Sequence, residues 1–410
     1  MTANTSCCIV GGGPAGVILA LLLARFGVST TLLEAKEDFD RAFRGDTVHP
    51  STLEMLDDLG LAEPLLARGH GTMHRMTLHS GKTTAAVLAD FSRLRSRFPF
   101  IAMIPQVEFL DFIVGEAKKH ESFDLHMGAR VTHLIIEDEV VRGVRYRDPD
   151  GAHELRALLT VAADGRASRL GKLAGFTPKK NATAMDVMWL VLPRGDDERA
   201  SDMTGLRVGR GRLVVVLARA DQWQLGYVIL KGDSHSIREA GLDALRSEVA
   251  VLVPELADRV DTIRDWSDIH FLSVESSRLP TWHRAGLLAI GDAAHVMSPI
   301  GGVGINYAIQ DAVAAANLLA APLLAGTLTD EHLAAVQRRR ELPTRIIQAF
   351  QGVVQRQLVT RALDDKPFRL PWPARIMLAL PLLRTLLPRL IGWGIRPERV
   401  RLFPVTSQIP

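Results

Sequence analysis

The stretch CCIVGGGPAGVILALLLARFGVSTTLLEA, residues 7–35, constrains the fold more than any other part of the chain. It holds Gly11, Gly13 and Gly16 in G-x-G-x-x-G spacing between an apolar strand and an apolar helix. Such glycines permit the bend, the approach of a pyrophosphate and the packing of helix on strand, and the helix N-terminus faces the phosphates. Glu34 ends the next strand, where an acid accepts hydrogen bonds from ribose hydroxyls. The stretch predicts a dinucleotide-binding βαβ unit, and the acid favours FAD or NAD over NADP.

Composition excludes several classes of protein. The 410 residues are 47% hydrophobic and 23% charged, which is typical of a globular chain of two or three domains. The only cysteines, Cys7 and Cys8, are adjacent, so we expect neither a disulfide framework nor a four-cysteine metal site, and the cytoplasm is the predicted location. No signal peptide is expected before the glycine turn. The sequence holds no uninterrupted apolar run of about 18 residues, so we expect no membrane-spanning helix.

Positive charge is concentrated toward the end of the chain. Residues 331–410 hold 14 Lys and Arg against 5 Asp and Glu, whereas the net charge of the whole chain is only +3. A basic segment can indicate an anionic surface as partner. Because no nucleic-acid motif accompanies it and the aromatic residues do not interleave with the basic ones, we predict no nucleic-acid partner.

Strand-like segments fill the middle of the chain, where DVMWLVLP, GRLVVVLA, QWQLGYVIL and IHFLSVESS lie within residues 183–278. From Gly286 the sequence returns to a buried strand and a glycine loop, GLLAIGDAAH, followed by a helix to about Leu324. Another long helix, from about Glu331 to Leu363, carries an apolar stripe. The order of these elements predicts a sheet domain inserted into the dinucleotide-binding domain.

Two further stretches resemble known motifs. VAADGRASRLG, residues 161–171, and LLAIGDAAHVMSPIGGVGINYAIQDA, residues 287–312, resemble the second and third fingerprints of the FAD-dependent monooxygenases related to p-hydroxybenzoate hydroxylase. Arg44 and Gln106 also stand where that family places side chains that contact FAD. The resemblance runs in order from Cys7 to about Ala325 and therefore covers most of the chain.

The resemblance implies an α/β fold with three parts. We expect a Rossmann-type FAD-binding domain formed by residues 1–180 and 280–330, an inserted β-sheet substrate domain formed by residues 181–279, and a C-terminal helical segment formed by residues 331–410.

Some of the motif residues also have a physical reason to contact FAD. Asp292 ends an apolar strand, so its carboxylate emerges at the carboxyl edge of a sheet and can accept hydrogen bonds from a ribityl chain. Glycines in the following loop let the backbone approach a flat ring, and the next helix points its N-terminus at that ring and favours an anion there. The predicted FAD-binding residues are Gly11, Gly13, Gly16, Glu34, Arg44, Gln106, Asp164, Gly291, Asp292, Pro299, Gly302, Gly304, Ile305 and Asn306.

Simpler interpretations of these residues stay open. The 287–312 stretch can be an ordinary glycine-rich connection between a strand and a helix. Asp164 can lie in a solvated surface turn. Arg44 can be a solvated arginine, and Gln106 can cap the helix that follows it.

The chemistry follows from the resemblance and from two absences. The sequence has no second strand–G-x-G-x-x-G–helix unit and no redox-active cysteine pair, so a nicotinamide coenzyme must visit the flavin transiently. The resemblance implies that NADH or NADPH reduces FAD, that molecular oxygen adds to it, and that the flavin hydroperoxide transfers one oxygen atom to an aromatic or polyketide-like small molecule. The alternatives are an FAD-dependent reductase or halogenase on the same scaffold and a non-catalytic flavin-bearing binding protein.

Residues on the substrate side carry a weaker signal. By resemblance Pro299 lies beside the flavin ring. His49 is near Arg44 in the sequence, and an imidazole facing the ring can take a phenolic proton, although a loop histidine bonded to backbone explains His49 as well. In QWQLGYVIL, Trp223 and Tyr227 share one face, and with Trp189 they can line an aromatic pocket. A place in the core is the simpler interpretation of all three.

The basic apolar segment PWPARIMLALPLLRTLLPRLIGWGIRPE, residues 371–398, is broken by Pro381 and Pro388 and predicts short helices. They can cap the flavin domain, or they can form a peripheral contact with an anionic membrane that admits a lipophilic substrate. Both a monomer and a homodimer are compatible with the sequence.

Overall fold

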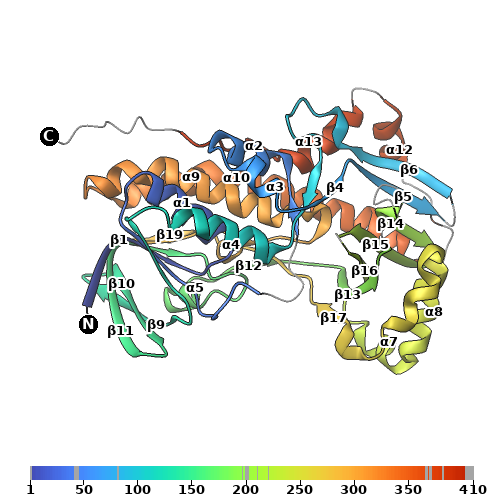
Figure 1. Ribbon diagram of the computed structural model, residues 1–410, viewed down its shortest axis with the longest axis horizontal. Helices are drawn as coiled ribbons and strands as arrows, with labels where there is room; N and C mark the ends of the chain where they lie inside the picture. Colours follow the sequence, from blue (N-terminus) through green and yellow to red (C-terminus); the bar gives the residue numbers. More distant parts are fainter. Residues whose placement is uncertain are drawn as a thin grey trace.

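Two mixed sheets, joined by long helices, form the frame of the computed structural model (Figure 1). The structure describes residues 2–40, 46–80, 83–195, 197–198, 203–209, 211–219, 221–364, 368, 372–380 and 383–401.

The first sheet has the strand order β19-β20-β11-β1-β2-β8, with the hairpin β9–β10 paired to β11. Its strands are β1 (Thr2–Val10), β2 (Thr30–Leu33), β8 (Phe123–His126), β9 (Arg130–Glu137), β10 (Val140–Asp148), β11 (Gly151–Ala162), β19 (His283–Arg284) and β20 (Leu287–Ala289). The order reverses at β1, because β2 lies on one side of it and β11 on the other. Val10 pairs with Leu33 and Ala162, and Ala162 pairs with Ala289, so four parallel strands end together. Such a switch point is where open α/β sheets bind ligands.

The long apolar helices pack on this sheet and on one another. They are α1 (Pro14–Arg25), α4 (Gln106–Ala117) and α9 (Gly304–Leu324). One helical stretch of the described chain, Ile300–Leu324, is long and apolar enough to cross a membrane, but 72% of its apolar window is buried inside the protein. It is the central helix of the core, next to α1.

The second sheet has the order β17-β13-β16-β15-β14-β5-β6. Its strands are β5 (Arg75–Ser80), β6 (Thr83–Asp90), β13 (Met185–Pro193), β14 (Gly205–Gly209), β15 (Arg212–Ala218), β16 (Gln222–Leu230) and β17 (His270–Leu272). Helix α8 (Leu242–Leu252) and the 3-10 helix Pro254–Thr262 cover one face. Two of these strands, β5 and β6, come from residues 1–180, so the N-terminal part of the chain contributes to both sheets. The domain boundaries stay a prediction.

Smaller elements complete the architecture. Two three-stranded sheets are built from β3 (Thr47–Val48), β7 (Ile101–Met103) and β4 (Gly71–Met73), and from β12 (Lys179–Asn181), β18 (Ser276–Arg278) and β21 (His295–Val296). The short helices are α2 (Pro50–Asp58), α3 (Ala62–Leu66), α5 (Arg169–Leu173) and α7 (Ser234–Ala240).

The C-terminal segment is helical over most of its described residues up to Gly392. Helix α10 (Asp330–Val354) packs along α9 and continues through a π-helical turn, Gln355–Val359, into α11 (Thr360–Ala362). Helices α12 (Trp372–Ala379) and α13 (Leu386–Gly392) follow, and the chain then runs back along α9 to Arg401 (Figure 1). The predicted short helices are present; Pro381 lies outside the described residues.

Candidate active site

The glycine turn sits at the switch point between β1 and α1. The N–H of Gly11 donates to the carbonyl of Leu33, and the N–H of Ala163 donates to the carbonyl of Val10, so the turn is held between two neighbouring strands. Gly11 has a φ of +107°, and a Cβ there would lie 2.4 Å from the carbonyl oxygen of Ala163. Only glycine fits this position. Gly13 precedes the first turn of α1, whose free N–H groups face the end of the sheet.

The acid at the end of β2 lies on this turn. Glu34 is buried, and its carboxylate accepts hydrogen bonds from the N–H of Gly12 at 2.7 Å and from the N–H of Lys36 at 3.1 Å. The structure therefore brings the acid and the glycines together as a βαβ nucleotide site requires.

The second and third motifs meet beside it. Arg166 and Asp292 form an ion pair, and the Asp164 carboxylate accepts hydrogen bonds from the Ser168 hydroxyl and the Leu170 N–H at the start of α5. Burial raises the pKa of Asp164 despite these bonds. Gly291 packs against α1, where a Cβ on it would lie 3.1 Å from the Cβ of Ala15. All three motifs thus line one edge of the first sheet.

A glycine loop leads from this edge into α9. Gly302 has a φ of +64°, and its carbonyl accepts a hydrogen bond from the Thr47 hydroxyl at 3.1 Å. Asn306, in the first turn of α9, accepts hydrogen bonds on Oδ1 from the hydroxyls of Ser51 and Thr52. Its Nδ2 is buried without a hydrogen-bond partner among the described residues. At Gly304, a Cβ would meet nothing within 4 Å.

These features fit an extended FAD. The turn with its helix N-terminus suits the pyrophosphate, Glu34 suits a ribose, and Asp292 is partly exposed at the sheet edge where a ribityl chain would run. The open space at Gly304 and the unpartnered amide of Asn306 suit the polar edge of a flat ring.

Comparison with known proteins agrees with this geometry. The model of the FAD binding domain family matches residues 4–349. The chain is 34% identical over 403 residues to the 6-methylpretetramide 4-monooxygenase of Streptomyces rimosus. The aligned region covers 97% of this chain and 94% of that protein.

The chain belongs to the FAD-dependent aromatic hydroxylases related to p-hydroxybenzoate hydroxylase. It is also 27% identical over 318 residues to the pentachlorophenol 4-monooxygenase of Sphingobium chlorophenolicum. This alignment covers 76% of this chain and 57% of that protein. The solved structure of the OxyS anhydrotetracycline hydroxylase from Streptomyces rimosus has the same fold, with a TM-score of 0.75 at 22% identity. The superposed region covers 98% of this chain and 78% of that one. The predicted monooxygenase class, FAD cofactor and α/β fold are confirmed.

His49 of this hydroxylase is buried between α2 and the C-terminal segment. Its Nδ1 lies 2.8 Å from the carbonyl oxygen of Ile391, so Nδ1 carries the proton that this bond requires. Burial lowers the pKa of His49 to about 4, which keeps the ring neutral near pH 7. Its Nε2 faces Gly302, where a Cβ would lie 3.6 Å away, and has no hydrogen-bond partner among the described residues. Pro299 opens the helical turn that contains Gly302.

The three aromatic candidates do not lie together. Trp223 and Tyr227 are fully buried in the core between the second sheet and α8. Trp189 lies on the opposite face, over Gly226, and packs in the same apolar cluster as Ile300, which follows Pro299. Of the three, Trp189 is therefore the one on the side of the glycine loop.

Two of the remaining predicted residues, Gln106 and Ile305, each lie in the first turn of a helix. Gln106 begins α4, and its N–H donates to the Asp46 carboxylate at 3.2 Å. Burial raises the pKa of Asp46 to about 6 although Arg219, directly after β15, forms an ion pair with it. Ile305 is half-buried in the first turn of α9. Arg44 lies outside the described residues.

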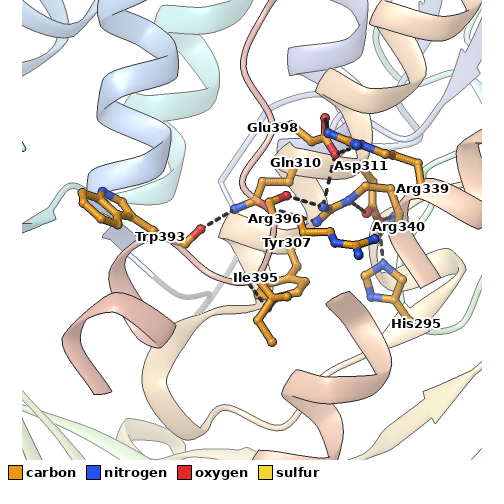
Figure 2. A network of polar contacts seen from close by, with 11 residues as sticks. His295, Tyr307, Gln310, Asp311, Arg339, Arg340, Trp393, Ile395, Arg396 and Glu398 are labelled. Carbon is orange, nitrogen blue, oxygen red and sulfur yellow. Dashed lines mark hydrogen bonds and ion pairs between the residues drawn. The ribbon is translucent and has the colours of Figure 1, made fainter. Parts of the chain in front are cut away.

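A buried ionic network under the site was not anticipated (Figure 2). Asp311 accepts a hydrogen bond from the Gly291 N–H at 3.1 Å, contacts His295 Nε2 at 2.5 Å and pairs with Arg340 Nε at 3.0 Å. Burial alone would raise the pKa of Asp311, but His295 and Arg340 outweigh it and hold this pKa below its usual value. Glu398, near the end of the described chain, adds a second carboxylate 3.6 Å from Arg340. The network fixes the edge that carries Asp292.

Only part of this network had a signal in the sequence. Asp311 closes the third motif, and His295 follows its Gly-Asp turn, as a buttress would. Arg340 ends the run RRR, which suggests a solvated helix face; its spacing from Val336 and Ile347, four and seven residues away, is what places it on the buried face.

Proposed function

We propose that this hydroxylase inserts one oxygen atom from O2 into a fused aromatic polyketide, with NADH or NADPH as electron donor. The observation that carries the proposal is the 34% identity, over nearly the full length of both chains, to a monooxygenase named for 6-methylpretetramide. The FAD monooxygenase class itself follows from family membership.

The bound FAD supplies the activation of oxygen, which side chains alone cannot perform. The protein holds and orients it. The α1 N-terminus and the glycine turn bind the pyrophosphate, and Asp292 accepts hydrogen bonds from the ribityl hydroxyls. The N-terminus of α9 stabilises negative charge on the polar edge of the ring. The apolar cluster of Trp189 and Ile300 excludes water from the side where the substrate approaches.

The neutral His49 suits a hydrogen-bond acceptor better than a strong base. With Nδ1 donating to Ile391, the lone pair on Nε2 is available to an O–H or N–H beside Gly302. We propose that His49 orients a substrate hydroxyl or the ring, rather than storing a proton near pH 7.

The test is a screen of FAD-reconstituted protein with aromatic polyketides, which measures NAD(P)H oxidation, oxygen uptake and product mass together. A product heavier by one oxygen atom, formed with equal consumption of coenzyme and oxygen, is the expected result. Saturation of a double bond without oxygen uptake would identify a reductase, and a halogenated product in the presence of halide would identify a halogenase. Tight ligand binding with no coenzyme oxidation for any compound would identify a binding protein.

One observation favours a peripheral membrane contact of this enzyme as a second candidate role. On α12, Trp372 and Ile376 are exposed four residues apart, Leu380 follows at the same spacing, and Arg375 lies beside them. Apolar side chains flanked by arginines suit an anionic lipid surface. Co-sedimentation with phosphatidylglycerol vesicles at low salt tests it, with Trp372→Ser as the variant and exposed Leu342→Ser on α10 as the control. Absence of binding by the unmodified protein would remove this role.

A further inference from the structure

Three glutamines form a buried polar row along one face of the C-terminal helix. Gln348 and Gln351 lie near the end of α10, and Gln355 begins the π-helical turn that continues it. They are 7%, 2% and 3% exposed, respectively. Glutamine side chains are seldom this deeply buried without a demanding set of hydrogen-bond partners.

Gln351 contacts the loop that enters α9. Its Nε2 donates to the carbonyl of Ser298 at 2.8 Å and to the carbonyl of Ile300 at 2.9 Å. Both donors of one amide are therefore used on two carbonyls that flank Pro299. The Oε1 atom is buried without a hydrogen-bond partner among the described residues, so donation to the loop is the function that this side chain performs.

The other two glutamines extend the row in both directions. Gln348 Nε2 donates to the carbonyls of Val296 and Ser277, and Gln348 Oε1 accepts from Arg278. Gln355 Nε2 donates to the Ser298 hydroxyl at 2.9 Å. Along the loop, the acceptors are the carbonyls of residues 296, 298 and 300 and one side-chain hydroxyl.

The spacing explains why a helix can do this. Glutamines three and four residues apart rise about 4.5 and 6 Å along a helix. Pro299 has αR backbone angles and begins a 3-10 turn, so the carbonyls of Ser298 and Ile300 lie close enough for one amide nitrogen to bond both. Gln355, one helical turn further on at the start of the π-helical turn, reaches the Ser298 side chain instead of a further carbonyl.

The loop needs these donors because no strand supplies them. β21 ends at Val296, and the residues from Met297 to Val303 pair with no strand. Buried carbonyls must still be satisfied. The same loop holds Gly301 and Gly302 at φ of +78° and +64°, backbone that only glycine adopts readily, directly before the open space at Gly304.

We propose that Gln351, supported by Gln348 and Gln355, is a positioning residue that sets the Ser298–Gly302 backbone against the FAD ring. The C-terminal helix thereby forms part of the active site although none of its described side chains need touch the flavin. The inference rests on the proposed function only for its catalytic readout, because loop order and FAD affinity can be measured without any substrate.

The experiment compares Gln351→Met with Gln337→Met. Methionine keeps the length of the side chain and removes both donors. Gln337 lies on the same helix and bonds Pro280 and Trp282, away from the loop, so it is the matched control. Hydrogen exchange of the backbone amides of residues 300–304 in apoprotein is measured first, followed by the FAD dissociation constant, the visible spectrum of bound FAD, and the share of consumed coenzyme that appears as hydrogen peroxide.

In Gln351→Met we expect at least tenfold faster exchange at residues 300–304, about tenfold weaker FAD binding, a shifted flavin spectrum and a larger peroxide share. Gln337→Met should change none of these. Unchanged loop exchange and spectrum in Gln351→Met, or equal changes in both variants, would overturn the proposal. If Gln351→Met does not accumulate as folded protein, Gln355→Met gives the same comparison with a smaller expected change, because it removes one donor to the loop, to the Ser298 hydroxyl, together with a long bond from the Ala184 N–H at 3.4 Å. Failure of every substrate to turn over, with the exchange and affinity results intact, would instead count against the proposed function.

Discussion

Arg166 and Asp292 form an ion pair across the carboxyl edge of the first sheet, with 3.2 Å between Arg166 Nε and Asp292 Oδ2. The two residues belong to different motifs and lie 126 positions apart in the sequence. Because both side chains are partly exposed, the pair itself contributes little to stability. Its value is geometric, since it shows that the second and third motifs meet at the site where FAD would run.

The first prediction concerns Asp292. Asp292→Ala should weaken FAD binding about 10- to 100-fold, because hydrogen bonds to a charged acceptor are worth about 1.5–3 kcal/mol. The measurement is titration of apoprotein with FAD, followed by flavin fluorescence. Arg166→Gln breaks the same ion pair but keeps the carboxylate, so it should lose far less affinity. Full FAD occupancy in Asp292→Ala would count against the assignment.

A second prediction separates stability from cofactor binding at Gly304. Gly304→Ala should leave apoprotein as stable or about 0.5–1 kcal/mol more stable, because a Cβ meets nothing within 4 Å and alanine favours the helix. The same methyl group should lower FAD affinity about tenfold if the ring occupies that space. Gly115→Ala in α4, also without neighbours, is the control and should stabilise without any effect on FAD. Equal FAD affinity in both variants would place the ring elsewhere.

The buried ionic network gives a third prediction. Arg340→Met should destabilise the protein by about 3–5 kcal/mol, because it leaves the Asp311 carboxylate buried with less compensation. Urea unfolding of apoprotein measures the change. Arg338→Met, two residues away, removes an ion pair with Glu331 whose partners are both mostly exposed, and should cost less than about 1 kcal/mol. Similar losses in the two variants would show that the buried network is not the source.

The fourth prediction is a pH dependence caused by His49. Its folded pKa of about 4 lies below the ordinary value of 6.5, so the unfolded chain binds the proton more tightly. The resulting stability is complete above about pH 6.5 and is lost as the pH falls toward 4, about 2 kcal/mol of it by pH 5. His49→Asn can keep the donor to Ile391 but cannot titrate. Urea midpoints of both proteins at pH 7.5 and pH 5 give the comparison, and identical pH dependence would refute this role of His49.

The motifs and the first sheet could be predicted from sequence because their signals are local. The glycine spacing, the acid at the end of β2 and the Gly-Asp turn each lie within one strand–turn–helix unit. Period-two alternation also placed Trp223 and Tyr227 on one face of β16, and they do share a core. Whether this face of β16 belongs to the core or to a pocket depends on where α8 packs, and no local sequence pattern encodes the position of α8.

The polar contacts beneath the site could not be predicted for the same reason. Gln351 meets Ser298 across 53 positions, and His49 meets the carbonyl of Ile391 across 342. The partners are backbone carbonyls, which every residue carries, so the sequence offers no complementary side chain to recognise. A glutamine at helical spacing suggests a solvated surface until the loop before α9 is placed against it. The recruitment of β5 and β6 into the second sheet is likewise a long-range pairing.

The contacts of Glu398 with Arg339 and Arg340 have a consequence for how the protein is made. The glycine turn leaves the ribosome long before the carboxylate of Glu398, which completes the network beneath Gly291 and lies near the other end of the given sequence. Growing chains fold from the N-terminus onward, so the nascent polypeptide holds the glycine turn before the buried ionic network beneath Gly291 is complete. Cofactor capture in the cell should therefore follow synthesis of Glu398 rather than synthesis of the glycine turn.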